Sequence, residues 1–116
     1  MKFSFELINE SFKTYSASFY QNGLNAPEAT ELINELGGSI AWAFDSDGIF
    51  IGTLAGAFKE GKTEQVSGIL NIPDGACFTL QRIDDNTVSL RTGYLANLQY
   101  GNGILNNFII TFKVYN

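Results

Sequence analysis

Alternation of apolar and polar residues with a period of two recurs along most of the chain. It is clearest near the C-terminus, where Phe108, Ile110 and Phe112 fall on every second position. Neighbouring side chains of a strand point to opposite faces, so this pattern predicts a strand with one face on a core. Similar patterns predict further strands over residues 2–8, 12–20, 39–44, 49–58, 66–72, 76–83 and 87–92. The residues predicted to be mostly buried come from these strands and from segment 27–36, and they are Phe3, Phe5, Leu7, Leu32, Ile33, Trp42, Phe78, Leu80, Val88, Leu90, Ile110 and Phe112.

One segment has a helical pattern instead. Residues 27–36 begin with Pro27, which fits a first helical turn, and Glu28, whose charge complements the helix dipole. An apolar stripe follows at Ala29, Leu32, Ile33 and Leu36, and a Gly-Gly pair comes directly after it. The segment therefore predicts one short α-helix, whose apolar stripe should lie on a sheet.

The fold expected from these elements is a single domain over residues 1–116. No strand–helix–strand alternation occurs, so the sheets should be mainly antiparallel. We expect a mainly β protein, an antiparallel β-sandwich or jelly-roll-like domain of about eight strands with one short α-helix at about 27–36. A single curved sheet with the helix packed on one face is the alternative.

Charge and composition exclude several classes of function. The net charge is −5 and the seven basic residues are scattered, which predicts no binding of nucleic acid or of an anionic membrane surface. The chain has no histidine and one cysteine, so the usual catalytic triads and cysteine clusters cannot form. We therefore predict a protein that is not an enzyme and needs no cofactor. The first ten residues lack the pattern of a signal peptide, which predicts cytoplasmic localisation at synthesis.

One acidic segment has part of the pattern of a cation site. Asp45 and Asp47 lie in the run Asp-Ser-Asp-Gly, which is similar to half of a calcium loop. Ala43 and Leu54 stand where that loop would need its first ligand and its bidentate glutamate. The run therefore favours a hairpin turn, and no metal site is predicted.

The candidate binding segment lies between residues 94 and 107 and is rich in tyrosine and amides. Tyrosine rings supply contact area at low entropic cost and amides supply adaptable hydrogen bonds, a mixture suited to sugars or a protein partner. The competing interpretation is a Gly/Asn-rich loop folded over the edge of the core. The candidate binding residues are Tyr94, Asn97, Gln99, Tyr100, Asn102, Asn106 and Asn107.

Self-association is predicted from the aromatic residues of segment 12–20. Phe12 and Tyr20 would lie on one face of that strand, and Tyr15 and Phe19 on the other. A strand with two aromatic faces is either central in the fold or exposed to a partner chain. These four residues are the candidate oligomer interface.

The C-terminal segment GNGILNNFIITFKVYN resembles the end of small β-rich bacteriophage structural proteins. The resemblance departs from the family pattern at Phe112-Lys113, where a more polar pair is expected. It implies a virion component, associated with capsid or tail, and implies no catalytic residues. The residues that carry it are Asn102, Gly103, Ile104, Leu105, Asn106, Asn107, Val114 and Tyr115.

Two functional hypotheses follow from the sequence. The first is a non-enzymatic structural or interaction protein, a virion component that acts as an oligomer through protein partners. The alternative is a small carbohydrate- or ligand-binding module that uses the Tyr/Asn-rich segment 94–107.

Overall fold

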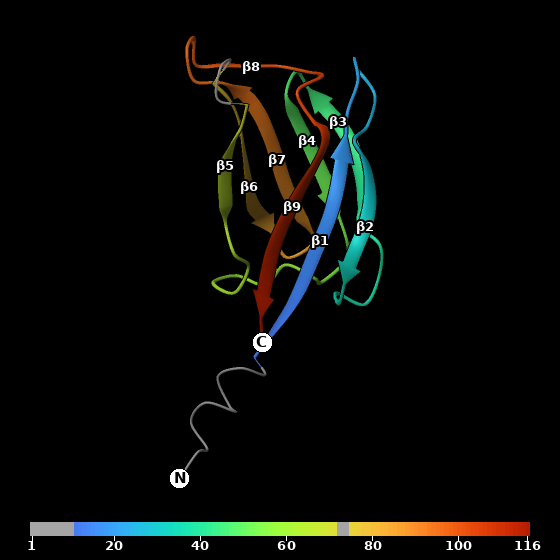
Figure 1. The fold of residues 1–116 in the computed structure, drawn as a ribbon. Coiled ribbons are helices and arrows are strands. Elements are labelled where there is room, and N and C mark those ends of the chain that lie inside the picture. Colours follow the sequence, from blue (N-terminus) through green and yellow to red (C-terminus); the bar gives the residue numbers. More distant parts are fainter. Residues whose placement is uncertain (1–10, 72–74) are drawn as a thin grey trace.

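The computed structural model describes residues 11–71 and 75–116, so the strand predicted over residues 2–8 lies outside the described part (Figure 1). The described residues form nine strands and no helix, and hence no helix that could cross a bilayer. The strands are β1 (Phe12–Tyr20), β2 (Glu28–Asn34), β3 (Ala41–Ser46), β4 (Ile49–Thr53), β5 (Val66–Asn71), β6 (Ala76–Asp84), β7 (Thr87–Tyr94), β8 (Gln99–Tyr100) and β9 (Asn106–Tyr115).

The strands form two sheets in which every pairing is antiparallel. The smaller sheet has the order β2-β1-β9. The larger sheet has the order β3-β4-β7-β6-β5, with the short β8 attached to β7. Figure 1 places the smaller sheet across one face of the larger one. The prediction of a mainly β, antiparallel protein is therefore confirmed.

The core lies between the two sheets and is built from the inward faces predicted by the alternation. Phe112 of β9 contacts the ring of Tyr15 across its own sheet, with centroids 5.3 Å apart. Phe19 of β1 meets Trp42 of β3 edge to face at 5.1 Å, which joins the two sheets. The predicted core residues that are buried are Leu80, Val88, Leu90, Ile110 and Phe112. Trp42 and Phe78 are partly buried against this core, and Phe3, Phe5 and Leu7 lie outside the described residues.

The predicted helix at 27–36 is wrong, because its central residues form strand β2 along the edge of β1. Leu32 and Ile33, predicted to be buried, are 56 % and 48 % exposed. A helix of this length gains little stability alone, whereas the edge of β1 offers a row of backbone hydrogen bonds. A bulge in the pairing opposite Ser16 and Ala17 accommodates the extra residue.

The candidate oligomer interface is also corrected in part. Tyr15 and Phe19 are fully buried in the core, so they contact their own chain and are not available to a partner. The predicted division of faces is right, since Phe12 and Tyr20 lie on the opposite side of β1. Phe12 contacts Tyr115 there, with ring centroids 5.6 Å apart.

The acidic run at 45–48 forms the predicted hairpin turn between β3 and β4. Gly48 has a φ of 68°, a conformation that glycine adopts without strain. The turn lies beside the segment that follows β8, and this contact shapes the candidate site.

Candidate functional site

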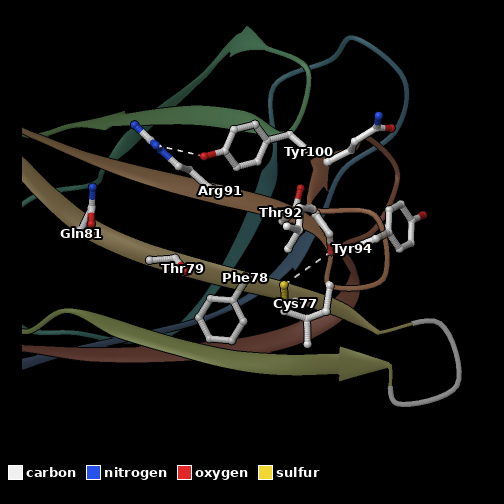
Figure 2. A pocket seen from close by; sticks show the side chains of 12 residues that line it. Cys77, Phe78, Thr79, Gln81, Arg91, Thr92, Tyr94 and Tyr100 are labelled. Atoms are coloured by element: carbon white, nitrogen blue, oxygen red, sulfur yellow. Dashed lines mark hydrogen bonds between the residues drawn. The ribbon is translucent and has the colours of Figure 1, made fainter.

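A hollow among the described residues lies on the outer face of the larger sheet, beneath the segment that joins β7 to β8. It has a volume of about 350 Å³, at the lower end of the range for small-molecule pockets. Figure 2 shows it from close by. It is lined by Cys77, Phe78, Thr79, Gln81, Arg91, Thr92, Gly93, Tyr94, Leu95, Leu98, Gln99 and Tyr100.

The pocket exists because β8 folds back along the end of β7. Gly93 pairs with Tyr100, and a Cβ atom at Gly93 would lie 2.6 Å from the carbonyl oxygen of Gln99. Only glycine permits this approach of two backbones. The turn between the strands is closed by a hydrogen bond from Leu98 N to Tyr94 O, and Leu98 has a φ of 56°. Residues 94–100 therefore form a short wall over the sheet.

The β3–β4 turn supports this wall from the other side. The backbone N–H of Thr92 donates a hydrogen bond to Gly48 O at 2.8 Å. The carbonyl oxygen of Thr92 accepts a hydrogen bond from Gly101 N at 3.0 Å. Asn102 accepts from Gly48 N at 2.7 Å through Oδ1, and donates from Nδ2 to Asp47 at 2.9 Å. The wall is thus attached at both ends to strands of the rigid sheet.

Arg91 is the charged group of the pocket. Its Nη1 donates a hydrogen bond to the hydroxyl of Tyr100 at 3.2 Å, and its guanidinium carbon lies 5.8 Å from the centre of the Tyr100 ring (Figure 2). Its Nε is buried and has no hydrogen-bond partner among the described residues. Arg91 forms no ion pair within residues 11–71 and 75–116.

The second arginine of the chain is used differently. Arg82 donates from Nε to the carbonyl oxygen of Phe58 at 2.7 Å, and its Nη2 pairs with Asp85 at 2.6 Å. Its Nε and Nη2 both have partners within the protein. Of the two arginines, therefore, Arg91 in the pocket is the one whose Nε lacks a hydrogen-bond partner among the described residues.

Other polar atoms near Arg91 divide into satisfied and unsatisfied ones. Thr92 donates its hydroxyl to Gly101 O at 2.8 Å, which holds the wall and leaves no donor for a ligand. Ser89, beside Gln81 in the β6–β7 pairing, has a buried Oγ without a hydrogen-bond partner in the described chain. Two polar atoms on the outer face of β7, Arg91 Nε and Ser89 Oγ, are therefore buried and unsatisfied.

The remainder of the lining is mainly apolar. Cys77 places its Sγ 3.6 Å from Gly93 O, and Leu95 and Leu98 border the pocket from the wall. Leu98 is 85 % exposed and Leu95 is also exposed. The pocket thus combines a cationic end at Arg91 with an apolar end under the wall.

The structure separates the candidate binding residues into two groups. Tyr94, Gln99 and Tyr100 line the pocket, although the Tyr94 ring turns away from Arg91 and packs near Gly101 (Figure 2). The remaining residues have local roles or lie elsewhere. Asn97 accepts from Gln99 N at 3.0 Å, Asn102 holds the β3–β4 turn, and Asn106 and Asn107 begin β9 in the other sheet.

Sequence reasoning missed Arg91 and Gln81 as site residues. Both fall on the polar side of the alternation in segments 76–83 and 87–92, which is the outer face of β6 and β7. Their position in a pocket depends on β8, a two-residue strand without a periodic signal. The alternation of β7 therefore contains no signal that separates an arginine in a pocket from one in water.

The described residues contain no group of three or more carboxylate, cysteine or histidine side chains that could hold a metal ion. The donors of the pocket are a guanidinium, amides and hydroxyls, which bind anionic or hydroxylated molecules rather than cations. The arrangement can therefore orient a polar group at one end and cover an apolar surface at the other.

Comparisons of the chain with protein-family models, with curated proteins and with solved structures gave no match. The functional argument consequently rests on the geometry of the pocket and the surfaces around it.

Proposed function

We propose that this domain is a non-enzymatic binding protein, built as a β-sandwich, that holds a small ligand in the pocket between β7 and β8. The observation that carries the proposal is the unsatisfied Nε of Arg91, buried at the end of a pocket of about 350 Å³. Buried polar groups are nearly always hydrogen-bonded, and exceptions mark sites where a partner is missing.

The construction of the pocket supports binding. The guanidinium of Arg91 donates a hydrogen bond to the Tyr100 hydroxyl, and the backbone of Tyr100 is paired with Gly93. Side chains held by such contacts lose little freedom when a ligand arrives, so more of the interaction energy appears as affinity. Sugar hydroxyls and other small polar groups suit the amides of Gln81 and Gln99.

The experiment is a binding screen with a matched pair of tyrosine variants. We expect a glycan array or a fragment screen by protein NMR to give ligands whose chemical-shift changes cluster at Arg91 and Tyr100. Tyr100→Ala should remove that binding. Tyr20→Ala is the control, because Tyr20 is a similarly exposed tyrosine on the other sheet. Binding that survives Tyr100→Ala would place the ligand elsewhere and refute the proposal.

A second candidate function is the structural role of a self-associating virion component, as the resemblance of the C-terminal segment implies. It is favoured by exposed apolar side chains on the outer face of the smaller sheet. Ile109 is 62 % exposed there and pairs with Ser18 of β1, while Ile33, which pairs with Ser16 on the other edge of β1, is 48 % exposed. Monomeric proteins rarely expose contiguous apolar patches of large area, and symmetric oligomers are a common way of covering them.

Sedimentation at micromolar concentration tests this second function. An oligomer that Ile109→Lys converts to a monomer would support it, with Ile83→Lys on the larger sheet as the control. A wild-type monomer of 12.7 kDa at every concentration would refute self-association and leave the pocket proposal unaffected.

A further inference from the structure

From the surroundings of Arg91 we infer that the ligand of this pocket carries a carboxylate, attached to a compact body with an apolar face. The inference rests on the proposed function and specifies the class of ligand. It depends on three properties of the site: an unpaired cation, a free edge of its guanidinium, and an apolar end.

The first property is a cation left without an acid in an acidic protein. The chain has twelve Asp and Glu residues against seven Lys and Arg, so acidic partners are abundant. Arg82 has such a partner in Asp85, whereas Arg91 forms no ion pair within the described ranges. Removing a charged group from water without a counter-charge is costly. A bound anion would remove this cost.

The second property is the direction in which Arg91 can donate. Its Nη1 is occupied by the Tyr100 hydroxyl, so the edge formed by Nε and Nη2 makes no hydrogen bond within the described chain. Two parallel N–H groups on a planar guanidinium match the two oxygens of a carboxylate. The contact with Tyr100 thus leaves this edge without a protein partner, and a carboxylate reaches the buried Nε when the side chain of Arg91 shifts on binding.

The third property is the apolar end of the pocket. Cys77, Leu95 and Leu98 line it, while Gln81 and Thr79 supply polar groups along the sheet. A body of monosaccharide or phenyl size fits a volume of about 350 Å³. Two sources share this chemistry, an acidic sugar and a small aliphatic or aromatic acid, and the probes below distinguish them.

The test compares acids with uncharged analogues of the same shape, by titration calorimetry and protein NMR. The acidic probes are glucuronate, N-acetylneuraminate and phenylacetate, and the uncharged counterparts are glucose and phenylacetamide. We expect at least one acid to bind about tenfold or more tightly than its counterpart, as a charge-assisted bidentate contact would give. Preference for the sugar acids or for phenylacetate identifies the source, and inorganic phosphate tests whether any anion suffices.

Arg91→Gln should lower the affinity for the acid to that for its uncharged counterpart. Arg91→Lys should retain part of the preference for the acid. Lys59→Gln removes the same charge from an exposed position outside the pocket and should change nothing. Should Arg91→Gln fail to fold in a thermal melt, Tyr100→Phe is the second variant, since it releases the guanidinium without changing the charge.

Five results would overturn the inference. Equal binding of acids and uncharged analogues, or binding of uncharged glycans alone, would refute the carboxylate and leave the proposed function intact. Phosphate binding more tightly than every carboxylate would assign a different anion, and an acid preference that persists in Arg91→Gln would assign a different group. Absence of binding by every probe and every screened ligand would refute the proposed function together with the inference.

Discussion

The guanidinium of Arg91 and the hydroxyl of Tyr100 are joined by a hydrogen bond of 3.2 Å, which crosses from the middle of the larger sheet to its short outer strand. The two residues come from β7 and β8, and the backbone pairing of these strands brings them together. This contact orients the one charged side chain that lines the pocket.

Tyr100→Phe is expected to weaken ligand binding without unfolding the protein. The ring is kept and the acceptor of Arg91 is lost, so the affinity for a carboxylate should fall by roughly 3- to 10-fold. Tyr100 is exposed, and the free energy of unfolding should change by less than about 1 kcal/mol. Titration and a denaturant melt of the same sample measure the two quantities. A loss of stability equal to the loss of binding energy would mean that Tyr100 acts only on the fold.

Phe112→Ala should lower the free energy of unfolding by about 3–5 kcal/mol. Phe112 is fully buried and contacts the rings of Tyr15 and Phe58, so truncation leaves a cavity in the centre of the core. Ile109→Ala is the control on the exposed face of the same strand and should cost less than about 1 kcal/mol. Similar costs for both variants in urea melts would contradict the assignment of faces in β9.

Gly48→Ala should destabilise the protein by about 2–4 kcal/mol. Its φ is 68°, and a Cβ there would lie 2.5 Å from Thr92 O and 2.6 Å from Gly101 N. Gly23→Ala is a matched control, since Gly23 has a φ of 57° and no atom within 4 Å of its added Cβ. The control should cost only the backbone strain, about 1 kcal/mol. Thermal melts that gave equal losses would remove the evidence for a close approach at the pocket wall.

Acid should destabilise the β6–β7 turn through Asp84. The Thr87 hydroxyl, at 2.6 Å, is the main cause that holds the pKa of Asp84 below its usual value, and the Asn86 N–H at 2.8 Å adds to it. A lowered folded-state pKa contributes stability above the unfolded value of 3.8, and this is lost as pH falls through the folded value.

Asp84→Asn should therefore flatten the loss of stability below about pH 4, where the unfolded carboxyl begins to take up protons. Urea melts between pH 2 and 7 measure it. Glu60→Gln, an exposed residue, is the control for a general change of charge. An unchanged pH profile in Asp84→Asn would contradict a role for these hydrogen bonds.

Alkali should act through Tyr15. Burial is the main cause that raises the pKa of this hydroxyl, the charge of Glu31 adds to it, and the Trp42 indole opposes them. A raised folded-state pKa contributes stability that is complete below the unfolded value of 10.0 and is lost as pH rises toward the folded value.

Tyr15→Phe should remove this alkaline loss. Because the Tyr15 hydroxyl is buried without a hydrogen-bond partner in the described chain, the substitution should cost less than about 1 kcal/mol at neutral pH. Thermal melts from pH 7 to 11 measure both effects. A large loss at pH 7 would indicate that the hydroxyl forms a contact with Trp42 that contributes to stability.

The strands were predictable where their faces differ. Phe112 and Ile110 alternate with exposed residues because one face of β9 meets the core. The two faces therefore differ in polarity, and this difference is visible in the sequence. The prediction failed at Leu32 and Ile33, because their spacing fits a helix whereas their backbone pairs with β1 in the structure. The spacing of apolar residues within a segment does not show the free energy that the segment gains by pairing with the edge of another strand.

The candidate site was predictable only in its aromatic part. Tyr100 and Gln99 were recognisable by residue type, since tyrosine and amides recur in binding surfaces. Arg91 was not, because its partner lies across a strand pairing two residues long. Nothing in the alternation of β7 distinguishes an arginine in a pocket from one in water.

The smaller sheet joins β1 and β2, which are neighbours in sequence, to β9. Its Ser16–Thr111 side-chain bond of 2.8 Å spans 95 residues. Chains dominated by such distant pairings fold slowly, over milliseconds to seconds, because a long loop must close before the contacts stabilise it. During synthesis the aromatic inner face of β1 therefore stays uncovered by β9 until β9 has left the ribosome, and apolar surface exposed over such an interval favours aggregation.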